Sequence, residues 1–275
     1  MNKTYKKHKF TAKHTTKKHV LDINLKGFFC SCNTGNAREK DCVREAYNLL
    51  NKYADILYPP PPTADAEDTK AGDIVDDLEK ELAELRKTKD ARRFQVVDSG
   101  AKNVIFIKTT LDNPVQLAEK IVSDIAETKI KQSRTLLRLV PIEITCKAYV
   151  KDIENAFRQI ASKHFTDDTK TFSIIYNHRN NNNLKRDDVI KTVASVVSQL
   201  GPFQVNLKQA EISIVIEVIK GIALIGIVPN FIKYKKYNLH AITEQSEELA
   251  EPKLPKNSSQ LSETPEQIPA LSSDG

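Results

Sequence analysis

The residues best suited to chemistry in this chain are cationic side chains that occur in short runs. The densest run lies in TFSIIYNHRNNNNLKRDDVI (residues 171–190), between an apolar stretch and the start of a predicted helix. Arginine and lysine contact phosphate groups, and the planar guanidinium of arginine can hold one through two parallel hydrogen bonds. The candidate residues for binding a polyanion come from three segments and are Arg134, Arg138, Lys147, His178, Arg179, Lys185, Arg186, Lys233 and Lys235.

Aromatic residues alternate with the last of these lysines, at Phe231, Tyr234 and Tyr237. This composition can combine phosphate contacts with stacking of nucleic-acid bases. It also arises when the aromatic rings pack on the domain and the lysine heads point to water. Both interpretations are open at this point.

Motifs of catalytic sites are missing from the sequence. It holds no G-x-G-x-x-G after a strand, no P-loop, no G-x-S-x-G and no H-E-x-x-H. Half of the six histidines precede Asp22, which leaves His164, His178 and His240 for acid–base work. His164 is expected to close an amphipathic helix, and Glu217 to lie on the more exposed face of a strand. The sequence therefore predicts no catalytic residues.

Three of the four cysteines, Cys30, Cys32 and Cys42, have a C-x-C spacing plus one more. A structural zinc site usually needs four ligands, and no further histidine or cysteine lies nearby. We therefore expect structural thiols, two on one strand face and one near a helix start, and no metal. Without a secretory signal, the four cysteines favour a reducing compartment over a disulfide framework.

The charge is unevenly distributed along the 275 residues. The net charge is +6; lysines and histidines crowd the segment before Asp22, and acids outnumber lysines after His240. With 40% hydrophobic residues, we expect two compact units with flexible ends. The basic tail is either solubilising or a nucleic-acid arm or nuclear import signal. The apolar run at 222–228 is too short to cross a bilayer.

Hydrophobic spacing predicts alternating strands and helices in the first half. We expect a strand at 23–32 and a hairpin of strands 93–98 and 103–108 across Ser99-Gly100. Between them, a helix capped by Asn36 buries one stripe and stops at the prolines; the stripe is Val43, Ala46, Leu50, Tyr53 and Leu57. The acidic stretch 63–90 contains one short amphipathic helix and is either a solvated insertion or a docking helix.

The second half begins with a helix at Asn113-Pro114 and a strand-like segment, 135–148, in which Pro141 requires an edge or a bulge. Helices with buried rows at 150–160 and 189–200 then alternate with strands. The expected strands are 172–176, 211–220 and 221–228. One of the asparagines in 180–183 is expected to cap the following helix. This pattern indicates an α/β fold with a mixed sheet.

Four blocks of this sequence resemble the THUMP domain. They are SRTLLRLVPIEITCKA (133–148), FSIIYNHRNNNNLKRDDVI (172–190), VNLKQAEISIVIEVIKGIALIGIV (205–228) and KYNL (236–239). The segment 27–59 is similar to the N-terminal ferredoxin-like domain of the stand-alone eukaryotic THUMP proteins. Asn206 and Gln209-Ala210 depart from the family's aspartate and Asn-Pro pair, which bears on a turn and not on the fold.

The resemblance implies an α/β (α+β) protein whose ferredoxin-like domain precedes a THUMP domain. The expected parts are a disordered basic tail at 1–22, a ferredoxin-like domain at 23–110, a THUMP domain at 111–239 and a disordered acidic tail at 240–275. The acidic insertion, about 59–90, falls within the first domain.

The resemblance also implies a function. Proteins of this kind serve as non-catalytic adaptors that bind serine and leucine tRNAs and present them to a separate RNA cytidine acetyltransferase. That enzyme forms N(4)-acetylcytidine in the D-arm with its own acetyl-CoA and ATP, so no cofactor is expected here. The cations named above become candidate RNA-binding residues, and the expected location is the nucleus or nucleolus, with some cytoplasm. Too few residues follow Asn238 for a further catalytic domain. The alternatives are an RNA-modifying enzyme acting alone and an assembly protein.

Overall fold

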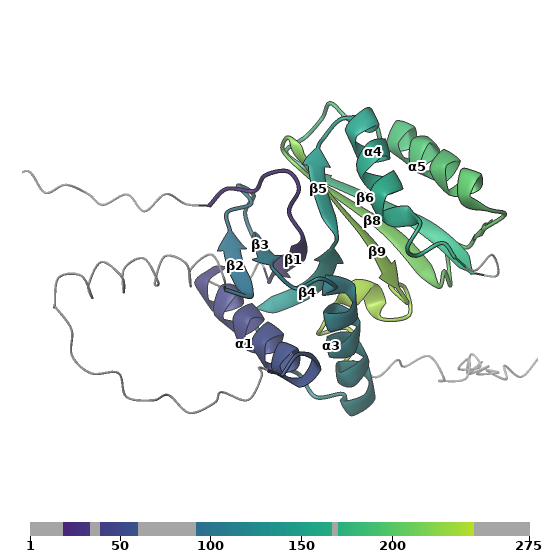
Figure 1. The fold of residues 1–275 in the computed structure, drawn as a ribbon. Coiled ribbons are helices and arrows are strands. Elements are labelled where there is room, and N and C mark those ends of the chain that lie inside the picture. The colour runs from purple at the N-terminus through teal and green to yellow at the C-terminus, as the bar shows by residue number, and fades with distance from the viewer. Residues whose placement is uncertain (1–18, 34–38, 60–91, 167–169, 245–275) are drawn as a thin grey trace, which may run out of the picture. The chain divides into compact units, whose positions relative to one another are not determined.

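The structure is a computed structural model that describes residues 19–33, 39–59, 92–166 and 170–244 (Figure 1). The predicted helix cap at Asn36, most of the predicted tails and nearly all of the acidic insertion lie outside the described residues.

The first half of the described chain builds a four-stranded antiparallel sheet in the order β2-β3-β1-β4. Its strands are β1 (Gly27–Cys32), β2 (Phe94–Val97), β3 (Val104–Thr109) and β4 (Leu136–Ile142). Helices α1 (Glu39–Leu57) and α3 (Pro114–Thr128) pack against each other on one face of this sheet (Figure 1). This β-α-β-β-α-β order is that of a ferredoxin-like unit.

The ferredoxin-like unit extends beyond the predicted boundary at residue 110. Because β4 pairs with β1 from Gly27↔Ile142 to Cys32↔Leu136, it completes the first sheet. Helix α3 packs on the same sheet, with Leu117, Ile121 and Ile125 fully buried. A domain boundary at residue 110 is therefore wrong, because it separates α3 and β4 from the sheet to which they belong. The local sequence pattern does not show which strands pair. Pro141 lies in the edge strand β4, as predicted.

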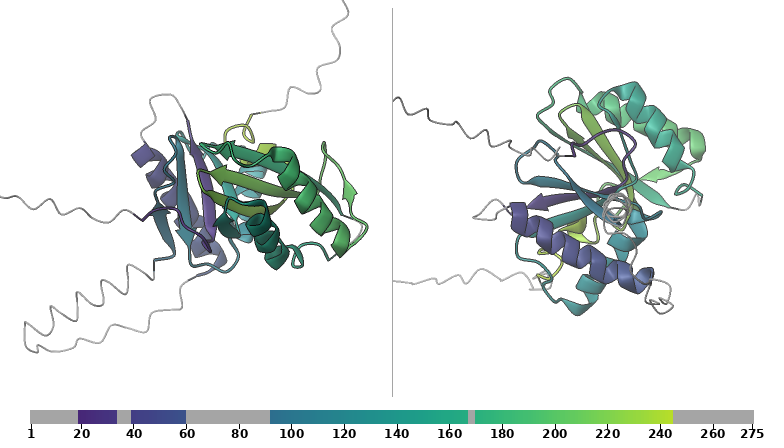
Figure 2. Two further views of the ribbon diagram at one scale, coloured as in Figure 1. Left: turned by 90° about the horizontal axis from the view of Figure 1, so that it is seen from above. Right: turned by 60° about the vertical axis from the view of Figure 1, so that its left-hand side comes forward.

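The second half builds a mixed five-stranded sheet in the order β5-β9-β8-β6-β7. Its strands are β5 (Ile144–Lys147), β6 (Thr171–Arg179), β7 (Gln204–Val205), β8 (Ile212–Ile219) and β9 (Ile222–Pro229). Helices α4 (Val150–Ala161) and α5 (Arg186–Leu200) lie side by side over one face of this sheet (Figures 1 and 2). The pairing of β6 with β8 is parallel and that of β8 with β9 antiparallel, which confirms the predicted mixed sheet.

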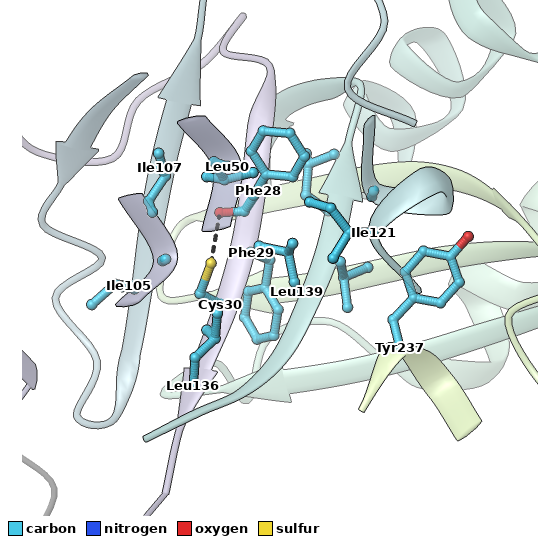
Figure 3. Packing of buried hydrophobic residues seen from close by; sticks show 14 of the residues in the cluster. Phe28, Phe29, Cys30, Leu50, Ile105, Ile107, Ile121, Leu136, Leu139 and Tyr237 are labelled. Atoms are coloured by element: carbon cyan, nitrogen blue, oxygen red, sulfur yellow. Dashed lines mark hydrogen bonds between the residues drawn. The ribbon is translucent and has the colours of Figure 1, made fainter. Parts of the chain in front are cut away.

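Both faces of β8 are buried, each in a different core. Ile212, Ile214, Ile216 and Val218 pack in the core beneath α4 and α5. Val215 and Ile219 pack instead with Phe29 and other residues of the first sheet. Figure 3 shows Phe29 in this first core together with Phe28, Leu136 and Leu139. The two sheets therefore share apolar contacts, and residues of β8 that point away from α4 and α5 face the first sheet.

The ordered structure is longer at both ends than predicted. Val20 bridges to Asp98, and the buried Leu21 donates its backbone N–H to the Asp98 carbonyl at 3.0 Å. At the other end, the buried Ile242 belongs to the first core. The predicted limits of the tails, at residues 22 and 240, are therefore wrong by a few residues. The apolar side chains at both ends are buried by contacts with residues that are distant in the sequence, which the local pattern does not reveal. Strand β1 itself begins at Gly27, later than the predicted Ile23.

Candidate nucleic-acid interface

Several predicted cations lie at one end of the second sheet. Lys147 of β5 pairs with Ile222 of β9, Ile222 pairs with Ile219 of β8, and Ile219 pairs with Arg179 of β6. This continuous row places Lys147 and Arg179 at the same end of the sheet, about 14 Å apart at the usual strand spacing. His178 precedes Arg179, and all three side chains are exposed.

The asparagine loop is tied to this end of the sheet by Asn181. Its side-chain Nδ2 donates to the carbonyl of Lys220 at 2.6 Å, and its Oδ1 accepts from the N–H groups of Asn183 and Leu184 at 3.0 and 3.1 Å. Asn180 has φ of 54°, in the left-handed region that asparagine tolerates. These bonds hold the loop that leads to Lys185 and Arg186 against the turn between β8 and β9.

The predicted asparagine cap of the next helix is wrong. Lys185 occupies the N-cap position of α5 and makes no side-chain capping bond. The side chain of Asn181 is committed to the loop instead, as the Asx-turn chemistry of asparagine allows. Asp187 and Asp188 do lie in the first helical turn, where negative charge suits the helix dipole. Lys185 and Arg186 are both exposed beside them.

Arg179 extends from the second sheet toward the first. Its Cζ lies 6.0 Å from the ring centroid of Phe29 on β1. Phe29 pairs with Val140 of β4, and Arg138 lies two residues before Val140, opposite Ser31. Diagonal neighbours of this kind are within reach of long side chains. Arg138 therefore lies on the same face of the first sheet as the ring that Arg179 approaches from the second sheet.

A buried carboxylate lies near this arginine pair. Glu217 of β8 is only 5% exposed, so its predicted position on an exposed face is wrong: that face is covered by the first sheet. Its Oε1 accepts a hydrogen bond of 2.7 Å from Nδ2 of Asn177, its pairing partner on β6. Its Oε2 is buried and has no hydrogen-bond partner. Burial raises the pKa of Glu217, against the opposing effects of Asn177, Arg179 and Arg138.

Lys220 adds a further cation at the contact between the sheets. It follows β8 with φ of 53°, and its N–H donates to the Arg179 carbonyl at 2.9 Å. Its Nζ lies so close to Gly100, in the β2–β3 hairpin, that a Cβ at Gly100 would be 2.6 Å away. The local sequence around Lys220 does not indicate that this residue contacts the first sheet.

Arg134 is held through its backbone by Glu45 of α1. The Glu45 Oε2 accepts bonds from the N–H groups of Arg134, Thr135 and Leu136 and from the Thr135 hydroxyl, at 2.8 to 3.1 Å. Partial burial acts to raise the pKa of Glu45, but these bonds outweigh it and lower the pKa. The exposed side chain of Arg134 is left free of this network.

Lys233 and Lys235 do not join the row of Lys147 and Arg179. Strand β9 runs antiparallel to β8, so Pro229 pairs with Ile212 at the opposite end of the sheet from Ile222. Both lysines are exposed and follow that opposite end, before and within the short 3-10 helix η1 (Lys235–Tyr237). The structure thus places them away from the row that the other cations form.

The aromatic residues between these lysines pack on the protein. Phe231 and Tyr237 are 3% and 0% exposed, and Tyr237 donates its hydroxyl to the Pro229 carbonyl at 3.0 Å. Tyr234 is half-buried, with its ring centroid 6.1 Å from that of Tyr237. Of the two open interpretations, base stacking is therefore wrong for Phe231 and Tyr237, because the first core covers them.

The remaining candidates for chemistry have structural partners. His164 Nε2 lies 2.8 Å from Glu143 Oε1, beyond the end of α4. The four cysteines are free and buried, and burial raises the pKa of Cys146 to about 12. Among the described residues, no group of histidine, cysteine and acidic side chains could hold a metal ion. No helix in that part of the chain has the length and apolar character needed to cross a membrane.

The cations of the interface differ from some other arginines of the described chain in forming no ion pair. Arg93 and Arg158 form ion pairs with Asp55 and Glu154. Within the described ranges, no ion pair involves any of the predicted RNA-binding residues. Their charge is therefore available to a polyanion that contacts this surface.

Comparisons with known proteins show which family this chain is similar to. A family model described as the THUMP domain matches residues 147–228. A Drosophila melanogaster protein named THUMP domain-containing protein 1 homolog is 39% identical over 255 residues, which cover 84% of this chain and 78% of that protein. This chain belongs to the THUMP domain-containing protein 1 family. The predicted resemblance and the α/β class are thereby confirmed.

More distant similarities extend over most of this THUMP protein. A Saccharomyces cerevisiae protein named tRNA acetyltransferase TAN1 is 25% identical over 254 residues, covering 82% of this chain and 86% of that protein. The crystal structure of PH1313 from Pyrococcus horikoshii Ot3 is 11% identical with a TM-score of 0.44; the match covers 74% of this chain and 54% of that one. This chain thus spans about half of that archaeal protein.

The interface extends beyond the segment that matches the THUMP model. Lys147 and Arg179 lie within the matched range, whereas Arg134 and Arg138 precede it. Asn206 and Gln209 differ from the residues usual in the family, but the turn at 206–209 before β8 still forms. Asn206 Oδ1 accepts hydrogen bonds from the N–H groups of Lys208 and Gln209 in this turn.

Proposed function

We propose that this protein is a tRNA-binding adaptor for tRNA cytidine acetylation. It binds serine and leucine tRNAs and presents them to a separate RNA cytidine acetyltransferase, which forms N(4)-acetylcytidine in the D-arm. The acetyl-CoA and ATP of that reaction are bound by the partner enzyme. The yeast relative, named a tRNA acetyltransferase, supports the link to this reaction.

One observation carries the binding part of this proposal. Arg179 of the second sheet extends to the ring of Phe29, Arg138 lies on the same face of the first sheet as that ring, and neither arginine has an ion-pair partner among the described residues. Lys147 continues this positive surface along the sheet end. Backbone phosphates of a structured RNA are the polyanion that such a surface suits, since folded RNA is recognised largely through shape and backbone.

The test is the salt dependence of tRNA binding. With three or more phosphate contacts, affinity should fall about tenfold or more between roughly 50 and 200 mM monovalent salt. Reversing two charges, Arg179→Glu with Arg186→Glu, should weaken binding by about tenfold and lower the salt slope by about two.

A matched control separates the site from net charge. Lys163→Glu with Lys208→Glu makes the same charge change at exposed positions outside the candidate set and should leave affinity near that of the wild type. Thermal unfolding of each variant checks that the fold persists. An affinity that stays constant with salt, or that falls equally in both double variants, would contradict a localised site.

The name of the yeast relative also fits a second function, in which the protein transfers the acetyl group itself. Purified protein incubated with serine tRNA, acetyl-CoA and ATP distinguishes the two. The adaptor predicts no acetylcytidine until the partner enzyme is added. Acetylation by this protein alone would establish the enzyme instead.

A further inference from the structure

The least expected side chain in the interface is a carboxylate between the two sheets. Glu217 is 5% exposed and lies in the middle of β8, where Val215 and Ile219 on the same face pack into the first core. Placing an ionised carboxylate in such a position costs free energy unless opposite charge and hydrogen bonds compensate. An apolar residue at this position would meet the packing requirement at no such cost.

The compensation available to Glu217 comes from three side chains. Asn177 of β6 satisfies one oxygen, through the 2.7 Å bond to Oε1. Arg179 of β6 and Arg138 of β4 are the two positive charges that act on it, one from each sheet. The second oxygen, Oε2, is buried and without a hydrogen-bond partner, so the carboxylate retains an acceptor site that neither guanidinium group occupies.

The arginines have donors to spare. A guanidinium carries five N–H donors in a planar fork, so it can contact a carboxylate on one side and a phosphate on the other. Two arginines on separate sheets would otherwise repel each other and spread into solvent. A negative charge that acts on both, held in place by the backbone of β8 and by Asn177, favours arrangements in which the two heads stay close to each other.

We propose that Glu217 is a positioning residue that draws Arg138 and Arg179 together, so that the two guanidinium groups form one phosphate-binding pair across the sheets. This rests on the proposed tRNA-binding function and assigns a task to a residue that touches no RNA itself. The predicted ligand at the pair is a single backbone phosphate of the tRNA.

The direction of the effect separates this role from simple electrostatics. A carboxylate that acts only through its charge repels RNA, so its neutralisation would strengthen binding. A carboxylate that positions the arginines has the opposite effect, because its neutralisation releases them from the geometry that a phosphate requires. The same neutral substitution therefore yields opposite results in the two cases.

The experiment measures binding of full-length protein to a serine tRNA transcript over a range of salt concentrations. Glu217→Gln keeps the shape and removes the charge. We expect about tenfold weaker binding and a salt slope reduced by about one, as for the loss of one phosphate contact. The matched control is Glu211→Gln, an exposed glutamate just before β8, which should bind as the wild type does.

Two further variants keep the test decisive if Glu217→Gln fails to fold. Arg179→Lys retains the charge but loses the planar fork, and it should weaken binding, whereas Arg158→Lys on α4 should not. If Glu217→Gln folds, a double-mutant cycle should show that its effect and that of Arg179→Lys are non-additive, because both disrupt the same pair.

Each outcome bears on the proposal in a defined way. Unchanged or tighter binding by Glu217→Gln with an unchanged salt slope overturns the role of Glu217 and leaves the proposed function standing. Equal binding by Arg179→Lys and the wild type overturns the shared phosphate pair. Wild-type protein without salt-dependent tRNA binding overturns both proposals at once.

Discussion

At the scale of single residues, two glutamates show how the same side chain meets opposite environments. Glu45 accepts four hydrogen bonds from residues 134–136, and its pKa is lowered. Glu217 is buried with one oxygen unbonded, and its pKa is raised. The first favours folding when ionised, whereas the second opposes it. Both residues are mid-element glutamates in the sequence, where nothing distinguishes their environments.

We predict that Glu217→Gln stabilises the fold at neutral pH. A carboxyl with a raised folded-state pKa opposes folding once the pH exceeds its unfolded value of about 4.3, so the wild type loses stability as pH rises. The variant should be more stable by about 1 kcal/mol at pH 7.5. Urea unfolding at pH 7.5 and pH 5 should show this gap narrowing at the lower pH. A variant that is less stable at pH 7.5 would contradict the unfavourable burial.

For Glu45 the predicted sign is reversed. Glu45→Ala should cost about 1 to 3 kcal/mol at pH 7, because it leaves three backbone N–H groups near Arg134 without their acceptor. Since the folded-state pKa is lowered, this contribution is present above the unfolded value of about 4.3 and is lost as pH falls through the folded one.

Urea unfolding over pH 3 to 7 measures the Glu45 effect. Asp41→Ala, which removes an exposed pair with Arg44 on the same helix, should cost less than about 1 kcal/mol. A Glu45→Ala cost no larger than that of Asp41→Ala would show that the four bonds add nothing.

At the scale of elements, the asparagine loop shows what a local pattern can and cannot predict. Its left-handed residue, Asn180, and the helix beginning near Arg186 follow from residue types alone. The task of Asn181 does not, because its partner is the carbonyl of Lys220, distant in sequence. We expected an asparagine to cap α5 because asparagine often caps helices. The Asn181 side chain instead bonds to the Lys220 carbonyl.

We predict that Asn181→Ala weakens both the fold and tRNA binding. It removes three hydrogen bonds at a position only 9% exposed, which should cost about 1 to 3 kcal/mol. Because Lys185 and Arg186 lose their fixed approach to the sheet end, tRNA affinity should fall as well. Asn182→Ala, at an exposed position, is the control for both measurements. Equal affinities for the two variants would exclude a role of the loop.

Most helices and strands were predictable, because the spacing of their hydrophobic residues and the capping or turn residues at their ends indicate the same element. The cap of α3 is one case: Asn113 accepts from Gln116 N–H, with Pro114 at the first helical turn. The hairpin at Gly100 and the alternating faces of β8 are others. The burial of Glu217 was missed because β8 has an apolar neighbour layer on both faces. No periodicity within one strand reveals what covers its second face.

At the scale of the whole described unit, the candidate interface belongs to neither sheet alone. Arg138 comes from the ferredoxin-like unit and Arg179 from the sheet of the THUMP segment. Lys220, which follows β8 of the second sheet, lies close to Gly100 of the first. The assignment of the cations to RNA binding stays a prediction. The candidates could be chosen from the sequence by residue type, but only the tertiary structure shows that Arg138 lies on the face of the first sheet that Arg179 approaches.

The most direct test of this account measures N(4)-acetylcytidine in serine tRNA from cells that lack the gene. Mass spectrometry should show the modification lost in those cells and restored by the wild-type protein. Arg138→Glu with Arg179→Glu should fail to restore it at equal protein abundance, because the surface between the sheets no longer binds tRNA. Lys163→Glu with Lys208→Glu should restore it. Full acetylation in cells that carry the Arg138→Glu, Arg179→Glu protein, or in cells without the gene, would contradict the account.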